Sequence, residues 1–365
     1  MGTTQEDSAA QDAQEGVSQD ELEAEELLEE SEGAQEESPQ AALALLERIP
    51  QNIQIKEKFV EHYQRMLGDR YDLFMKFSLS YIRKAIRVNT LKISVEDLKK
   101  RLEPRWKLTQ IPWCKEGFWI EYKEEEGEKK RFDVGNLIEH ALGYIYVQEA
   151  ASMIPPVVLD PKPGMSVLDL CAAPGSKTSQ MASMMQNEGI LVANDIQGSR
   201  LKALGINIQR CGITNIVITM MQSGQLRKGT MRYDAILIDA PCSGVGTIRK
   251  SLKTLQMWSP GLVSKLNRVQ RQLVDDAFQM LKAGGTMVYS TCTLEPEENE
   301  AVVSHLLERY PDAYLEDIDL PITRSSANLE FEGLKIDPSC SKCLSIHPYD
   351  NNTEGFFVAR IRKRE

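Results

Sequence analysis

Apolar and polar positions recur along the chain with two periods, and from about residue 143 these periods alternate. Short apolar runs predict buried strands, and segments with helical spacing lie between them. The predicted strands are residues 167–170, 190–195, 216–219, 235–239 and 286–290, and the predicted helices are residues 177–185, 199–210 and 263–281. Alternation of this kind predicts a largely parallel sheet with helices on both faces, which is the doubly wound α/β class.

The region before this pattern mixes helix and strand signals. Residues 53–63 and 94–102 have helical spacing, and Ser94 is the predicted N-cap of the second helix. Residues 86–89 and 118–122 are predicted strands. We therefore expect a small α+β module over residues 41–145 and a larger α/β domain over residues 146–365. The charged loop at 123–130 is expected to be a solvated hairpin turn.

The first 40 residues differ from the rest of the chain in charge. They hold 14 of the 54 acidic residues and no lysine or arginine, so the rest carries 40 acids against 43 bases. The formal net charge of −11 therefore comes from this segment, and the remaining body is slightly basic. Since the segment also has few large apolar residues, it is predicted to be a disordered acidic tail.

Length and cysteine content narrow the class of protein further. No apolar run approaches the roughly 18 residues that a membrane helix needs, and residues 1–10 lack a secretory pattern. Seven cysteines without framework spacing favour a reducing compartment, so we expect a cytoplasmic protein. Cys340 and Cys343 have the spacing of metal ligands, but no second pair follows, and no metal is predicted.

The turn after the first predicted strand is Cys171-Ala172-Ala173-Pro174-Gly175-Ser176-Lys177-Thr178. A phosphate-binding P-loop needs glycine directly before the lysine, where Ser176 stands, and a dinucleotide fingerprint needs three glycines. Asp195, at the end of the second strand, is placed like an acid that holds ribose hydroxyls. A cofactor that contains adenosine but no phosphate fits these features, which indicates S-adenosylmethionine. A purely structural tight turn is the alternative.

Two cysteines each follow a predicted buried strand, Cys242 after residues 235–239 and Cys292 after residues 286–290. Ligands of doubly wound sheets bind beyond the carboxyl ends of the strands, so both thiols are expected to face one crevice. Thiolates are nucleophiles that form covalent intermediates. Two thiols at one site therefore indicate a covalent bond that is made and then broken.

Methylation of carbon 5 of a pyrimidine requires such chemistry. That carbon becomes nucleophilic only after a thiolate adds to carbon 6. The addition is easier when nearby groups neutralise the charge that develops at ring nitrogen 3 and the amino group, and Asp239 and Lys177 are the candidates. The second thiol would assist loss of the carbon 5 proton and cleavage of the carbon–sulfur bond.

These residues resemble the Sun/Fmu-type RNA 5-methylcytosine methyltransferases, which use S-adenosylmethionine. The similarity extends from about residue 86 to the C-terminus. It is carried by the segments Arg87-Val88-Asn89-Thr90-Leu91-Lys92, Gln148-Glu149-Ala150-Ala151-Ser152-Met153, residues 169–178, 200–215, 239–244 and 289–293, Glu298-Asn299-Glu300, and Gly355-Phe356-Phe357-Val358-Ala359.

The resemblance implies a Rossmann-like class I methyltransferase fold and a role for each site residue. Cys292 would be the nucleophile and Cys242 the thiol that aids product release. Residues alone leave this choice open, because DNA cytosine-5 methyltransferases use the cysteine of a Pro-Cys dipeptide, here Cys242. Lys177 and Asp239 would contact the target base. The residues expected around the cofactor are Cys171, Ala172, Ala173, Pro174, Gly175, Ser176, Lys177, Asp195, Arg200, Gln222 and Asp239.

Two positions depart from the usual pattern of the family. Gln222 stands where an acid usually contacts the adenine, although its carbonyl can still accept a hydrogen bond from the adenine amino group. Ser176 stands where glycine is more usual. The first departure puts one cofactor contact in doubt and leaves the predicted activity unchanged.

RNA is the expected partner. Basic clusters that could contact phosphates lie at residues 83–87, at Arg249 and Lys250 beside the Cys242 loop, and at residues 360–364. The N-terminal module resembles the short, partly RNA-recognition-like domain of compact tRNA-acting members, so tRNA is the first expected substrate and ribosomal RNA the alternative. A non-catalytic assembly factor and a DNA methyltransferase are the remaining alternatives. Protein partners are left open.

Overall fold

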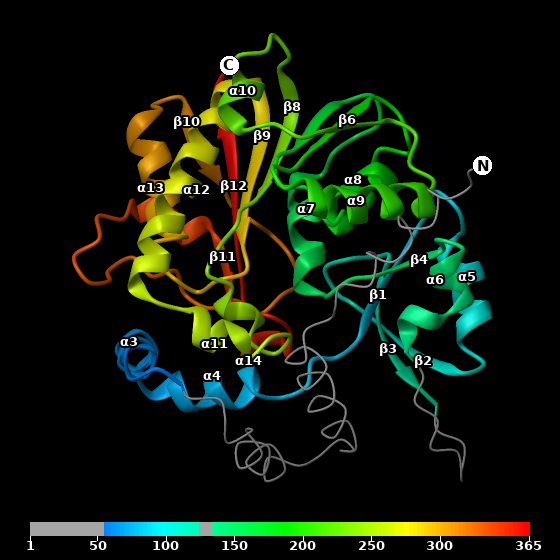
Figure 1. Ribbon diagram of the computed structural model, residues 1–365, viewed down its shortest axis with the longest axis horizontal. Coiled ribbons are helices and arrows are strands. Elements are labelled where there is room, and N and C mark those ends of the chain that lie inside the picture. Colours follow the sequence, from blue (N-terminus) through cyan, green and yellow to red (C-terminus); the bar gives the residue numbers. More distant parts are fainter. Residues whose placement is uncertain (1–54, 124–132) are drawn as a thin grey trace, which may run out of the picture. The chain divides into compact units, whose positions relative to one another are not determined.

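The computed structural model describes residues 55–123 and 133–365 (Figure 1). The predicted acidic tail, and the predicted hairpin turn beyond Lys123, lie outside these residues. The α-helices are α3 (Glu57–Leu67), α4 (Tyr71–Ser78), α5 (Val95–Leu102), α6 (Ile138–Ala141), α7 (Ile154–Leu159), α8 (Ser176–Met184), α9 (Gly198–Cys211), α10 (Ser223–Arg227), α11 (Lys253–Met257), α12 (Pro260–Met280), α13 (Glu300–Arg309) and α14 (Pro348–Asn351). The strands are β1 (Ala85–Val88), β2 (Trp106–Gln110), β3 (Gly117–Tyr122), β4 (Ile145–Val147), β5 (Ser166–Asp169), β6 (Ile190–Asn194), β7 (Ile216–Thr219), β8 (Tyr233–Asp239), β9 (Leu281–Thr291), β10 (Ala313–Glu316), β11 (Leu344–Ile346) and β12 (Phe356–Lys363).

The larger sheet has the order β7-β6-β5-β8-β9-β12-β10, with β11 also paired to β12. The first five strands in this order are parallel, and β12 runs antiparallel to its neighbours. Later strands lie on both sides of β5, with β6 and β7 on one side and β8 and β9 on the other, as a doubly wound fold requires. The predicted α/β class and the five predicted strands are therefore confirmed.

Hydrophobic side chains are buried on both faces of this sheet. Along β8, Ala235 and Leu237 belong to one core, and Ile236 and Ile238 to the other. Because side chains alternate between faces along a strand, continuous apolar runs are needed where helices cover both. In Figure 1, α8 and α9 lie on one side of the strands, and α12 and α13 on the other.

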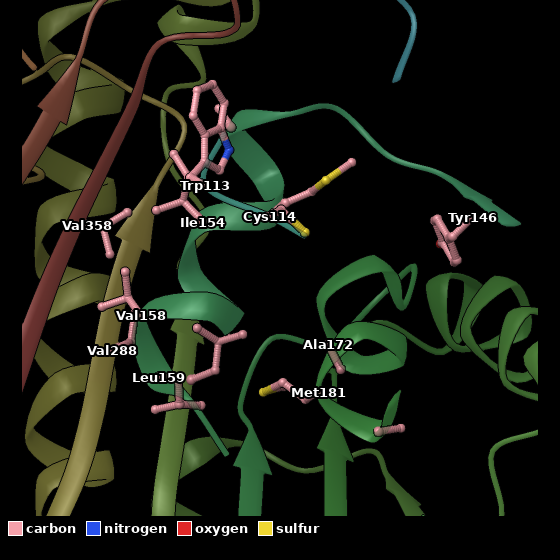
Figure 2. Packing of buried hydrophobic residues seen from close by; sticks show 14 of the residues in the cluster. Trp113, Cys114, Tyr146, Ile154, Val158, Leu159, Ala172, Met181, Val288 and Val358 are labelled. Atoms are coloured by element: carbon pink, nitrogen blue, oxygen red, sulfur yellow. The ribbon is translucent and has the colours of Figure 1, made fainter. Parts of the chain in front are cut away.

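The smaller sheet is antiparallel, with the order β2-β3-β1-β4. Its own core contains Ile86, Leu98 and Phe118. Its other face joins the core of the larger sheet, where Trp113 and Cys114 share a cluster with residues of α7, α8, β9 and β12 (Figure 2). The two sheets therefore share this hydrophobic cluster.

Arg87 of β1 adds a polar connection between the sheets. Its side chain is 2% exposed, and it donates hydrogen bonds from Nε to Gln148 Oε1 at 2.8 Å and from Nη2 to Ser179 Oγ of α8 at 2.7 Å. A guanidinium group buried in this way is not available to a phosphate. One member of the first predicted basic cluster is thus a structural residue.

Residues 55–365 form one compact unit. Within it, α3 packs on the later part of the chain, where the ring of Phe59 lies 5.3 Å from that of Trp258. The division at residues 145 and 146 stays a prediction. No described helix is long and apolar enough to cross a bilayer.

Candidate active site

The carboxyl ends of β5, β6, β8 and β9 meet at one edge of the larger sheet, because these four strands are parallel neighbours. The loop that starts at Cys171 follows β5, and Asp195 follows β6. Asp239 ends β8 and precedes Cys242, and Cys292 directly follows β9. Parallel strands thus bring the predicted site residues to one edge of the sheet.

The loop after β5 turns into α8 at Gly175. This residue has a φ of +105° and is the N-cap of α8, and a Cβ here would lie 2.8 Å from Leu204 Cδ1. Only glycine fits this left-handed position without strain. Thr178 anchors the turn by donating a hydrogen bond to Asp169 Oδ2 at 2.6 Å, and burial raises the pKa of Asp169 to about 7.

Asp195 and Arg200 are both brought against this loop. The buried Asp195 carboxylate accepts hydrogen bonds from the backbone N–H of Gln197 at 3.0 Å and of Ala173 at 3.3 Å. Arg200 Nη1 lies 3.3 Å from Asp195 Oδ2, and Nη2 of the same side chain donates to the carbonyl of Ala173. The predicted loop, acid and arginine form one connected group.

Gln222 has a structural task of its own. It is the N-cap of α10, and its side chain accepts a hydrogen bond from the third residue of that helix, while its backbone N–H donates to Gln225 Oε1 at 3.1 Å. Its side-chain oxygen is therefore engaged in capping, although a carbonyl oxygen can accept a second hydrogen bond. The predicted adenine contact stays a prediction.

Ile196 and Met220 were not predicted as site residues. They follow β6 and β7 and are 65% and 61% exposed. The Met220 sulfur lies 3.3 Å from the position that a Cβ on Gly198 would take, which places it beside the turn that carries Ile196. The sequence signal that could have identified these two residues is a large apolar residue soon after the end of a strand. They could flank a planar group next to Asp195.

Lys177 and Asp239 form an ion pair with 2.7 Å between Nζ and Oδ2. Lys177 Nζ also donates to Ser152 Oγ at 3.0 Å, and Ser290 Oγ donates to Asp239 Oδ1 at 2.9 Å. The Lys177 side chain is 9% exposed and that of Asp239 is 31% exposed. The Lys177 ammonium group is thus held by Ser152 and Asp239, and the partly exposed Asp239 carboxylate remains accessible to a ligand.

The two predicted thiols lie side by side, with 3.2 Å between Cys242 Sγ and Cys292 Sγ, and both cysteines are free. The hydrogen bond to Cys292, together with burial, raises the pKa of Cys242 well above its usual value. Either sulfur can donate this hydrogen bond, so the role of Cys292 as the nucleophile stays a prediction.

Cys171 does not join this pair in its chemistry. Burial, together with the negative charges of Asp169 and Asp239, raises the pKa of the Cys171 thiol far above its usual range. A thiol that stays protonated is a poor nucleophile. Its predicted place beside the cofactor stays a prediction.

Glu295, three residues after Cys292, is a buried acceptor that sequence reasoning missed. Its carboxylate accepts hydrogen bonds from Tyr63 OH at 2.5 Å and Trp258 Nε1 at 2.6 Å, and His62 Nε2 lies 2.8 Å away. Burial lowers the pKa of His62, but the hydrogen bond and charge of Glu295 outweigh this effect, so the pKa is raised. Helix α3 is thereby attached to the Cys292 loop.

The predicted phosphate contacts beside the Cys242 loop have partners within the protein. Arg249 donates to the backbone carbonyls of Ser80 at 3.1 Å and Thr353 at 3.2 Å. Lys250 Nζ lies 2.7 Å from Glu354 Oε1, and half of the Lys250 side chain is exposed. Arg249 thus joins segments of the protein, and Lys250 is the member of this cluster that is accessible from outside.

Cys340 and Cys343 are both buried, and the Cys340 sulfur lies 3.5 Å from Ser304 Oγ. Within residues 55–123 and 133–365, no three histidine, cysteine, aspartate or glutamate side chains are grouped to hold a metal ion.

Comparison with known proteins identifies the family. Residues 156–362 match the model of the 16S rRNA methyltransferase RsmB/F family, and residues 55–150 match the model of the N-terminal domain of the 16S rRNA methyltransferase RsmF. The chain belongs to the RsmB/F family of RNA methyltransferases. The predicted Sun/Fmu family, the enzyme class and the Rossmann-like methyltransferase fold are therefore confirmed.

Individual relatives cover different shares of their own length. The chain is 45% identical over 312 residues to the tRNA (cytosine(49)-C(5))-methyltransferase of Pyrococcus abyssi, which is 85% of this chain and 96% of that protein. It is 42% identical to the ribosomal RNA small subunit methyltransferase F of Vibrio parahaemolyticus over 86% of this chain, but spans 64% of that protein. A methyltransferase homologue from Pyrococcus horikoshii superimposes with a TM-score of 0.75 at 34% identity, covering 90% of this chain and all of that one.

Proposed function

We propose that the protein methylates carbon 5 of cytosine in RNA, with S-adenosylmethionine as the methyl donor and a covalent bond between Cys292 and the base. The observation that carries this proposal is the pair of sulfur atoms 3.2 Å apart beside the Lys177–Asp239 ion pair. A methyltransferase needs two adjacent thiols only when the substrate carbon must first be activated by addition and the adduct then resolved.

The residues after β5 and β6 fit S-adenosylmethionine. The buried Asp195 can accept from ribose hydroxyls, and the apolar side chains of Ile196 and Met220 can flank the adenine. The small residues at 172–175 let a ligand without phosphates lie against the backbone. When bound, S-adenosylmethionine supplies an electrophilic methyl group.

The ion pair fits the edge of a cytosine. The Asp239 carboxylate accepts from the amino group and orients the base, and the Lys177 ammonium donates to a ring acceptor and stabilises the negative charge that develops on the ring as the sulfur adds. Ser152 and Ser290 hold this pair in place before the base arrives. Orientation of this kind lowers the cost of the addition step.

The contact between the two sulfur atoms supports this order of events. Cys292 adds to carbon 6 as the thiolate. Once carbon 5 is methylated, the Cys292 sulfur is a thioether and Cys242 is the neighbouring thiol. Cys242 can then release its proton to water and take the proton from carbon 5. The double bond between carbons 5 and 6 reforms, and the electron pair of the carbon–sulfur bond returns to Cys292.

Transfer RNA is the first substrate that we propose. The match covers 96% of the Pyrococcus abyssi enzyme named for cytosine 49 of tRNA, whereas it covers 64% of the ribosomal enzyme of Vibrio parahaemolyticus. Ribosomal RNA is the second candidate, because residues 55–150 match an N-terminal domain model named for a ribosomal enzyme.

The test is transfer of labelled methyl groups from S-adenosylmethionine to tRNA, ribosomal RNA and DNA, with Cys292→Ala and Cys242→Ala as variants. We expect labelled 5-methylcytosine in tRNA, no transfer by Cys292→Ala, and a covalent protein–RNA adduct with Cys242→Ala. Label in ribosomal RNA alone would select the second substrate. Binding of RNA without any label would contradict the proposed activity.

A further inference from the structure

A buried group of polar side chains connects the loop after β8, which carries Cys242, with the loop after β9, which carries Cys292. We call these side chains, Ser243, Gln270, Thr293 and Glu298, the polar bridge. Ser243 and Thr293, which directly follow the two cysteines, share a hydrogen bond of 2.7 Å between their hydroxyl oxygens. All four side chains are at most 8% exposed. Hydrogen bonds in such a dry environment are costly to break, so the bridge limits how far the loops can separate.

Glu298 is the central hydrogen-bond acceptor of the polar bridge. Its Oε2 accepts from the Ser243 backbone N–H at 3.0 Å and from Gln270 Nε2 at 2.7 Å. Gln270 Nε2 in turn donates to the Pro241 carbonyl at 2.9 Å. Glu298 therefore holds the Cys242 loop on both sides of the cysteine, directly through Ser243 and through Gln270 at Pro241.

The Cys292 loop has supports that do not involve this carboxylate. The Cys292 carbonyl accepts from the Gly246 N–H at 2.9 Å, and Cys292 directly follows the long strand β9. A Cβ on Gly246 would lie 2.8 Å from that carbonyl oxygen, so this close contact depends on glycine. Loss of the Glu298 carboxylate would thus loosen the Cys242 loop at Pro241 and Ser243, while β9 and Gly246 still support Cys292.

We propose that Glu298 is a positioning residue that keeps the Cys242 sulfur next to Cys292 for the product-release step. This inference rests on the proposed cytosine methylation. It assigns Glu298 to one half of the reaction, because its carboxylate accepts hydrogen bonds from Ser243 in the Cys242 loop and from Gln270. Without it, addition and methyl transfer would proceed, and the methylated base would stay bonded to Cys292.

Glu298→Ala and Glu298→Gln test this role, with Glu300→Ala as the matched control. Glu300 is a buried carboxylate two residues away that accepts from the Asn328 N–H at 3.0 Å and touches neither cysteine loop. We expect Glu298→Ala to keep first-turnover methyl transfer within about threefold of wild type and to raise the fraction of enzyme trapped on labelled RNA about tenfold. Glu298→Gln keeps an acceptor oxygen and should restore release, and Glu300→Ala should trap no RNA.

A double variant separates positioning of Cys242 from general loosening of the fold. If Glu298 acts through Cys242, Glu298→Ala should add nothing to the adduct formed by Cys242→Ala, because the two changes remove the same step. Equal trapping by Glu300→Ala, an unchanged trapped fraction in Glu298→Ala, or additive effects in the double variant would overturn the proposal.

Three further outcomes separate a folding failure, a failure of the proposed activity and a failure of the proposed role of Glu298. If Glu298→Ala does not fold, Gln270→Ala removes the contact to Pro241 and should show the same trapping to a smaller degree. If wild type methylates no cytosine and Cys242→Ala traps no RNA, the proposed activity itself fails. Trapping by Cys242→Ala without trapping by Glu298→Ala or Gln270→Ala refutes only the role of Glu298.

Discussion

The proposed cofactor side of the site, residues 169–200, is one continuous strand–loop–helix–strand unit, whereas the thiol side joins two cysteines that lie 50 residues apart and follow different strands. On the proposed cofactor side, Asp195 accepts hydrogen bonds from Gln197, two residues later, and from Ala173, 22 residues earlier. On the thiol side, Glu295 takes a hydrogen bond from Tyr63, 232 residues earlier. Local turns shape the first region, and distant buried polar contacts hold the second, so substitutions should affect them differently.

Asp239→Asn should have the largest effect, because Asp239 lies between the two sides and pairs with Lys177. We expect the rate of methyl transfer to fall on the order of 10²- to 10⁴-fold, as charge at the base edge is no longer matched. Asp234→Asn is the control, since Asp234 lies on the same strand and pairs with Lys282 instead. A variant at Asp239 that keeps more than about a tenth of the wild-type rate would contradict the assignment.

Glu295→Ala should destabilise the thiol side strongly. His62, Tyr63 and Trp258 would each lose a buried partner, and breaking such a group costs about 3–5 kcal/mol. Urea unfolding measures this change. Tyr63→Phe removes a single hydrogen bond and should cost about 1–2 kcal/mol. A loss no greater in Glu295→Ala than in Tyr63→Phe would show that the distant contacts matter little.

Glu300→Gln should change how stability depends on pH. Burial raises the pKa of Glu300 to about 7 from 4.5, so the folded state holds a proton that the unfolded state releases. The stability from this group is fully present below about pH 4.5 and is lost as the pH rises through about 7, a change of up to roughly 3 kcal/mol. The variant cannot ionise, so its unfolding free energy should decline less between pH 5 and pH 8 in denaturant titrations. Parallel curves for variant and wild type would contradict this.

Ser94→Ala should have the smallest effect and should leave both sides unchanged. Ser94 Oγ accepts a hydrogen bond from the Asp97 N–H at 3.1 Å and caps α5 in the smaller sheet's half of the molecule. Loss of this cap costs about 1 kcal/mol. Thermal unfolding should report the loss while methyl transfer stays at the wild-type rate, and a fall in activity would mean that the two sheets are coupled.

The elements that could be predicted are those whose signal is local. Strand β8 is a continuous apolar run because both of its faces are buried, and Asp239 follows from its place at the end of that run. The Ser94 cap could also be predicted, since the hydroxyl and the backbone N–H that donates to it lie three residues apart. The pairing of both cysteines followed from their position after neighbouring parallel strands.

What could not be predicted depends on contacts between distant segments. Glu295 and Glu298 look like ordinary surface acids in a polar segment, and only the fold shows that they are 0% exposed. Arg87 and Arg249 look like phosphate contacts for the same reason, because a positive side chain in sequence carries no mark of burial. Gln222 looked like a ligand contact, and its capping of α10 needed backbone geometry.

The hydrogen bonds of Arg87 limit where two related enzymes can be joined to make a chimera. A designer who exchanges the smaller sheet between relatives to redirect substrate choice would cut near residues 145–150 and separate Arg87 from Ser179. The imported segment must then bring an arginine at this position, and the recipient must keep Gln148 and Ser179 to receive it. Recombination that respects these three residues should give folded chimeras, whereas a cut chosen from domain boundaries alone would leave a buried cation without its acceptors.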